Sequence, residues 1–196
     1  VLALLAALTK ITTFAVYAVP AAILAAGAIL LRLRSPKGGI NYPGACRSAL
    51  VSALPVILAL AVTWGWIAHG DTIKHSNPYT GFLASTELQT WNYGSLALRF
   101  DPSFWVHLWE NITRNLLSEG GLVIGLLAYT FAQPSARRVA LICLAGFFAG
   151  PLVFANLYHV HDYYYTANAL LLTMAAGLLL ASAWDNPRLT AAPRWM

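Results

Sequence analysis

Five long apolar stretches constrain this chain more than any other feature of its sequence. They cover residues 14–31, 50–67, 116–132, 139–158 and 166–184. An α-helix rises about 1.5 Å per residue, so about 20 apolar residues cross the hydrocarbon core of a bilayer. Charged residues make up only 10% of the chain, far below the content of soluble domains. The sequence therefore predicts an all-α, polytopic transmembrane helical bundle, and excludes a soluble globular enzyme or a nucleic-acid-binding module.

The beginning of the chain indicates that more sequence precedes it. The first residue is Val1, and residues 1–8 are apolar, which predicts the end of a sixth, truncated span. Residues 9–13 are predicted to form a hairpin turn before the first complete span. We therefore interpret residues 1–196 as a single transmembrane domain that is a fragment of a longer protein.

The distribution of charge predicts the orientation in the membrane. Eight of the 12 basic residues fall on one side of the predicted spans, and six of the seven acidic residues fall on the other. Cytoplasmic connections carry an excess of Lys and Arg, so the basic side is predicted to be cytoplasmic. The basic side holds Arg32, Arg34, Lys37, Arg47, Arg137, Arg138, Arg188 and Arg194. The net charge of +5 is then mostly a topology signal rather than a sign of nucleic-acid binding.

The predicted outer loop, residues 68–115, is rich in aromatic residues. From Phe104 to Leu116, apolar residues recur at helical spacing, after the start signal Asp101-Pro102. The opposite face carries His107, Glu110, Asn111 and Arg114. This pattern predicts an amphipathic helix that lies in the membrane interface. The alternative is an aromatic belt that extends the next span.

The segment NLYHVHDYYYTANA, residues 156–169, contains the strongest candidate site. His161, Asp162, Tyr163 and Tyr164 come at the outer end of the last predicted span. Polar groups near membrane depth usually face a cavity, so these residues are candidates for binding a polar or phosphorylated head group. An interfacial tyrosine anchor is the alternative. A divalent metal held by His159, His161 and Asp162 is possible, but the sequence implies no cofactor firmly.

Two further groups of residues carry candidate binding chemistry. Lys10 lies in the predicted outer turn, where it either snorkels to the head groups or pairs with a substrate phosphate. Trp91 and Asn92, followed by Arg99, combine an aromatic face, a hydrogen-bonding side chain and a cation. That combination suits a sugar phosphate. The alternative for this segment is packing within the loop.

Four segments, in this order along the chain, resemble the membrane glycosyltransferases of the glycosyltransferase-C superfamily. They are Leu8-Thr9-Lys10, the segment from Asp71 to Pro78, Trp91-Asn92-Tyr93-Gly94 with Arg99, and His161-Asp162-Tyr163-Tyr164. More narrowly, they are similar to bacterial relatives of dolichyl-phosphate-mannose protein mannosyltransferase and of lipid A aminoarabinose transferase. The resemblance extends over nearly the whole chain.

The resemblance implies an enzyme that transfers a sugar from a polyprenyl-phosphate carrier to an extracytoplasmic acceptor, which is a glycan, a lipid or a protein. It implies that Lys10 lies near the carrier phosphate, and that His161, Tyr163 and Tyr164 line the substrate cavity. It also implies a bacterial inner-membrane location. The family's catalytic carboxylate lies in the first outer loop, upstream of Val1, so no acid of this chain is assigned that role.

Two other classes of function remain as alternatives. A transporter or flippase subunit for lipid-linked sugars would share an outer cavity and a phosphate-binding cation. It would also need polar groups along a path to the cytoplasm, whereas the inner halves of the predicted spans are mostly Ala, Leu, Val and Gly. A non-catalytic membrane protein would leave the clustering of His, Tyr and Trp on the outer side without an explanation beyond aromatic belts.

Overall fold

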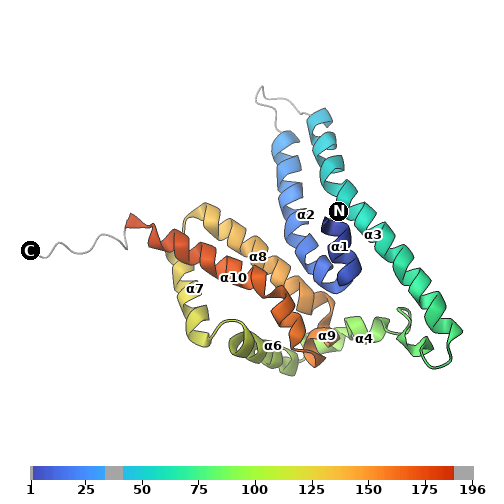
Figure 1. Ribbon diagram of the computed structural model, residues 1–196. Helices are drawn as coiled ribbons and strands as arrows, with labels where there is room; N and C mark the ends of the chain where they lie inside the picture. The colour runs from blue at the N-terminus through green and yellow to red at the C-terminus, as the bar shows by residue number, and fades with distance from the viewer. Residues whose placement is uncertain (1, 34–41, 188–196) are drawn as a thin grey trace, which may run out of the picture. The chain divides into compact units, whose positions relative to one another are not determined.

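The computed structural model describes residues 2–33 and 42–187, and this part of the chain contains helices and connecting segments but no strand (Figure 1). Four of its helices are long and apolar enough to cross a membrane, namely α2 (Ile11–Leu33), α3 (Tyr42–Ser76), α8 (Pro134–Val153) and α10 (Tyr163–Trp184). The predicted all-helical fold is thereby confirmed for the described residues, and the four apolar helices indicate a membrane protein. Arg34, Lys37, Arg188 and Arg194, which contribute to the predicted orientation, lie outside the described residues.

The chain divides into two compact units, Val1–Gly94 and Ser95–Met196, and each is described by itself. The first unit contains α1 (Leu2–Thr9), α2, α3, a 3-10 helix η1 (Gly81–Leu83) and α4 (Gln89–Tyr93). Helix α1 packs against both α2 and α3 around Ala7, Phe14 and Ala59. Most of the other apolar side chains of α2 and α3 are exposed, as expected for helices whose solvent is lipid.

Two boundaries in the first unit differ from the prediction. The expected turn at residues 9–13 is shorter than predicted, because Lys10 alone separates α1 from α2, and these two helices pack against each other. Helix α3 continues past residue 67 to Ser76, so the beginning of the expected outer loop is helical. Its 35 residues correspond to about 52 Å, which is longer than the hydrocarbon core of about 30 Å.

The second unit contains α5 (Leu96–Phe100), α6 (Pro102–Asn115), α7 (Glu119–Phe131), α8, α9 (Ala155–Val160) and α10. Helix α10 packs against both α8 and α7. The core between these helices consists largely of small side chains, including Ala128, Ala140, Cys143 and Ala175. Small residues let helix backbones approach closely, which is a common way for membrane helices to associate.

Two of the predicted spans in this unit differ from the observed helices. The stretch 116–132 contains α7, whose 13 residues correspond to about 20 Å and are too short to cross the hydrocarbon core alone. The stretch 139–158 is not one helix, because α8 ends at Val153 and Phe154 leaves the helical conformation before α9.

The amphipathic helix predicted after Asp101-Pro102 is present as α6. The Asp101 side chain caps it by accepting a hydrogen bond of 2.9 Å from the backbone nitrogen of Ser103. Phe104, Leu108 and Ile112 are buried, as the spacing predicts. Asn111 is buried as well, which corrects its assignment to the polar face. Its amide donates to the carbonyl oxygen of His107 at 2.9 Å, which satisfies the buried donor.

Candidate functional site

The junction between α9 and α10 holds the strongest predicted group of residues. His161 and Asp162 lie between the two helices, and Tyr163 and Tyr164 begin α10. The rings of Tyr163 and Tyr164 are stacked with their centroids 4.6 Å apart, and the His161 ring lies 5.1 Å from that of Tyr163. Tyr163 is 49% exposed, whereas Tyr164 is buried. The junction therefore presents a partly open aromatic surface with an imidazole at its edge.

A buried polar cluster supports this surface from below. Tyr165 donates a hydrogen bond of 3.0 Å to the carbonyl oxygen of Tyr158, and the Asn168 amide is bonded to the Tyr158 hydroxyl. The side-chain oxygen of Asn168 is buried and has no hydrogen-bond partner in the part of the chain that the structure describes. Sequence reasoning did not identify Tyr158 or Asn168 as part of the site. The signal for Asn168 was available, because an amide inside an apolar stretch is costly unless it is satisfied.

Arg99 lies beside the end of α8. Its guanidinium donates to the carbonyl oxygens of Leu152 at 2.7 Å, Val153 at 2.8 Å and Ser95 at 2.9 Å. The last carbonyls of a helix lack partners within the helix, and a cation there also complements the helix dipole. Arg99 thus stabilises the end of α8, close to the junction that carries His161. Its predicted contact with a lipid phosphate stays a prediction.

Two histidines of the second unit, one from α6 and one from α9, lie close together. His107 of α6 and His159 of α9 have ring centroids 5.2 Å apart, and the ring of Phe104 lies 6.3 Å from that of His159. The Nδ1 atom of His159 is buried and has no hydrogen-bond partner within residues 2–33 and 42–187. Among the described residues, no three His, Cys, Asp or Glu side chains are grouped so that they could hold a metal ion. The divalent metal considered for His159, His161 and Asp162 stays a prediction.

Lys10 belongs to the first unit, at the break between α1 and α2. Partial burial lowers the pKa of its ammonium group. The hydroxyl oxygens of Thr12 and Thr13, and that of Thr63 in α3, are buried without hydrogen-bond partners among the described residues. Unsatisfied buried hydroxyls are uncommon and call for a ligand, a water molecule or a functional explanation. Thr63 carries no signal in the sequence that would have distinguished it.

The segment after α3 is folded back onto that helix by a polar network. Asp71 accepts hydrogen bonds from the Ser85 hydroxyl and, at 2.9 Å, from the Ser85 backbone nitrogen. Lys74 forms an ion pair with Asp71 at 3.3 Å and donates to the carbonyl oxygen of Leu83 at 2.9 Å. These contacts give Asp71 and Lys74 a structural role.

Trp91 and Asn92 lie on the five-residue helix α4. It ends at Gly94, whose φ of 68° lies in the left-handed region that favours glycine. Trp91 is 48% exposed. The structure therefore presents Trp91 on the surface of the first unit, as binding to a sugar ring would require.

The predicted site residues fall into two sets. Arg99, His161, Asp162, Tyr163 and Tyr164 all belong to the second unit, around the end of α8 and the start of α10. Lys10, Trp91 and Asn92 belong to the first unit. Comparison of the chain with known protein families, with curated proteins and with solved structures finds no match.

Proposed function

We propose that this chain is part of an integral membrane glycosyltransferase that moves a sugar from a polyprenyl-phosphate carrier to an extracytoplasmic acceptor glycan, lipid or protein. The observation that carries the proposal is the ring surface of His161, Tyr163 and Tyr164 at the first turn of an apolar helix. A lipid-linked sugar has its hydrocarbon in the membrane and its polar part at the interface. A donor site therefore needs an aromatic and hydrogen-bonding surface at a helix end.

The chemistry of these side chains matches the parts of such a donor. Aromatic faces pack against the apolar face of a sugar ring, and the imidazole of His161 and the hydroxyl of Tyr163 are able to form hydrogen bonds with sugar hydroxyls. Lys10 supplies a cation for the carrier phosphate, and the buried hydroxyls of Thr12 and Thr13 are hydrogen-bond donors next to it in sequence.

The proposed reaction needs one general base. A carboxylate takes the proton of the acceptor hydroxyl while that oxygen attacks the anomeric carbon, and the bond to the carrier phosphate breaks. The charge that develops on the leaving phosphate is stabilised by Lys10. Asp71 and Asp101 are engaged in the contacts with Ser85 and Ser103. The resemblance to the glycosyltransferase-C superfamily implies that this carboxylate belongs to the family's first outer loop, so we assign the role of base to no acid of this chain.

The membrane topology is part of the same proposal. We place the α9–α10 junction on the extracytoplasmic side of a bacterial inner membrane, and Arg47, Arg137 and Arg138 on the cytoplasmic side. In this arrangement α6 lies in the outer interface, with the exposed rings of Trp105 and Trp109 at the level of the head groups. Helix α7 is then the core of a fifth span that neighbouring residues complete.

The proposal is tested in the complete encoded protein by replacing one side chain of each unit with alanine. We expect His161→Ala and Lys10→Ala to reduce transfer of a radiolabelled sugar from a polyprenyl-phosphate donor by about 100-fold, the loss typical of one transition-state contact. The matched control is His69→Ala, since His69 is exposed on α3 and lies outside the four segments that carry the resemblance. Immunoblots of the membrane fraction check insertion. Wild-type transfer by both variants would refute the site.

A further inference from the structure

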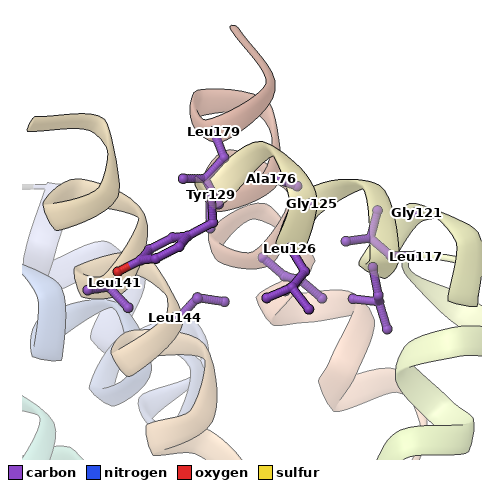
Figure 2. Close-up of a pocket in the computed structure, with 12 residues that line it drawn as sticks. Leu117, Gly121, Gly125, Leu126, Tyr129, Leu141, Leu144, Ala176 and Leu179 are labelled. Carbon is purple, nitrogen blue, oxygen red and sulfur yellow. The ribbon is translucent and has the colours of Figure 1, made fainter. Parts of the chain in front are cut away.

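An apolar cavity lies within the second unit, between α7, α8 and α10. Its volume is about 350 Å³, and its walls are formed almost entirely by leucine, alanine and glycine (Figure 2). Figure 2 shows Gly121, Gly125 and Leu126 along α7 and Leu141 and Leu144 on α8. The cavity is partly open rather than enclosed, so a ligand is able to enter from the surroundings of the helices.

The arrangement of the three helices explains why this space is left open. Helices α7 and α8 each pack against α10, and α7 contributes glycines where it faces the cavity. A Cβ atom added at Gly125 would meet no atom within 4 Å. Apolar cavities bind water poorly because water needs polar partners. Two of the three helices are candidate membrane spans, so the available solvent for this cavity is hydrocarbon.

One end of the cavity is bordered by positive charge. The ring of Tyr129 lines the cavity, and the guanidinium carbon of Arg137 lies 5.3 Å from the centre of that ring. Arg137 also donates to the carbonyl oxygens of Thr130 and Ala132, both at 2.8 Å, which keeps it at the end of α7. Arg138 is next in the chain and exposed.

The acidic residue at the same end of the unit is Asp185. It follows α10, whose Ser182 accepts a hydrogen bond from the backbone of Gln133, between α7 and α8. Asp185 is exposed, so solvent screens its charge. Two arginines against one carboxylate leave these described residues with a net positive charge.

We propose that the cavity binds an acyl chain of an anionic glycerophospholipid of the surrounding bilayer, with the lipid phosphate against Arg137 and Arg138. The apolar walls fit the chain, and the arginines fit the phosphate by charge complementarity. This site lies at the start of α8, whereas His161 follows its end. It is therefore separate from the donor site, and the inference does not rest on sugar transfer.

The test compares the lipids that stay bound to the purified chain. The chain is reconstituted in vesicles of equimolar phosphatidylcholine and phosphatidylglycerol, released in mild detergent and analysed by native mass spectrometry. We expect retained phosphatidylglycerol to exceed phosphatidylcholine by about 25-fold, which corresponds to two basic residues at an anionic head group. Arg137→Gln/Arg138→Gln is expected to remove this preference while a lipid is still retained.

Two variants fill the cavity from two different helices, α7 and α10. Gly125→Leu and Ala176→Leu are both expected to lose the retained lipid, because their side chains occupy the space of the acyl chain. Gly177→Leu is the matched control, since Gly177 is on α10, does not line the cavity and has open space around its Cβ position. Circular dichroism and gel filtration show which variants fold, and two filling variants keep the test decisive if one does not.

Several results would overturn the inference. Equal retention of the two phospholipids by the wild type would remove the role of the arginines. Unchanged retention in the folded filling variants would place the lipid elsewhere. A parallel reconstitution includes undecaprenyl phosphate, and its preferential retention, lost in Gly125→Leu, would assign the cavity to the sugar carrier. A dimer that Gly125→Leu dissociates would assign it to a second copy of the chain.

Discussion

At the scale of single residues, Gly150 shows how closely the second unit is packed below the candidate site. A Cβ atom at this position would lie 2.7 Å from Cζ of Tyr158, closer still to its hydroxyl, and 3.1 Å from Nδ2 of Asn168. The spacing of Gly146 and Gly150 predicts close approach of another helix. The structure identifies what approaches, namely the side chains of α9 and α10 that support the ring surface.

Replacing Gly150 by alanine is therefore expected to destabilise the protein. Tyr158 and Asn168 are bonded to each other, so neither side chain moves aside without losing that contact. We expect Gly150→Ala to lower the free energy of unfolding by about 1 to 3 kcal/mol, the usual effect of overpacking. Chemical denaturation in detergent measures the change. Gly177→Ala, with open space at its Cβ position, is the control, and equal stability of the two variants would contradict this account.

The residue type of Arg99 suggests its binding chemistry, but the sequence does not predict which groups it contacts in the fold. The sequence identifies an arginine close to aromatic and amide side chains, a combination that suits a sugar phosphate. In the folded chain its guanidinium is bonded to carbonyl oxygens that lie more than 50 positions away in the sequence. No local pattern contains this contact, because it depends on where α8 ends. In the folded chain this charge serves the end of α8.

At the scale of elements, the sequence predicts the beginning of a helix where that helix has its own start signal. Asp101-Pro102 predicts the beginning of α6, and the Asp101 carboxylate does cap it. Helix α3 lacks such a signal at its end. Asp71 and Lys74 mark residues 68–76 as polar and hence as loop, yet they pair along the helix and with the segment at Ser85. The helix therefore continues where composition predicts a loop.

The cap of α6 is expected to make its first turn sensitive to acid. The hydrogen bonds from Ser103 hold the pKa of Asp101 below its ordinary value. A lowered pKa in the folded state means that the cap stabilises α6 fully above the unfolded value of about 3.9. This contribution is lost as the pH falls through the lower, folded pKa.

Amide hydrogen exchange at Ser103 and the following residues of α6 measures the effect. We expect protection, corrected for the intrinsic rate, to decrease as the pH falls below about 3.9. Asp101→Asn keeps an acceptor for the cap but does not titrate, so its protection is expected to stay level over the same range. Equal pH dependence of the two proteins would show that another group is responsible.

At the scale of the whole molecule, the charge pattern predicts how the chain is oriented in the membrane. Helix packing alone does not test this orientation. Cys46 is exposed near the start of α3, on the side predicted to be cytoplasmic. We expect a membrane-impermeant maleimide to label Cys46 in spheroplasts only after permeabilisation.

A position on the opposite side of the membrane provides the comparison for Cys46. Glu87 is exposed in the segment between η1 and α4, which is predicted to be extracytoplasmic. Glu87→Cys in a Cys46→Ser background is expected to react without permeabilisation. Reaction of both cysteines from the same side would overturn the topology and, with it, the location of the proposed donor site.

The sequence by itself indicated a helical membrane protein, because bilayer thickness and helix rise together set the length of a spanning apolar stretch at about 20 residues. It also located the polar residues at the start of α10 and the cap of α6, since both are local patterns. Only the tertiary structure decided the end of α8, the support of the ring surface by Tyr158 and Asn168, and the cavity bordered by Arg137. Each depends on contacts between helices that are distant in the chain, and those contacts leave no periodic signal in any one segment.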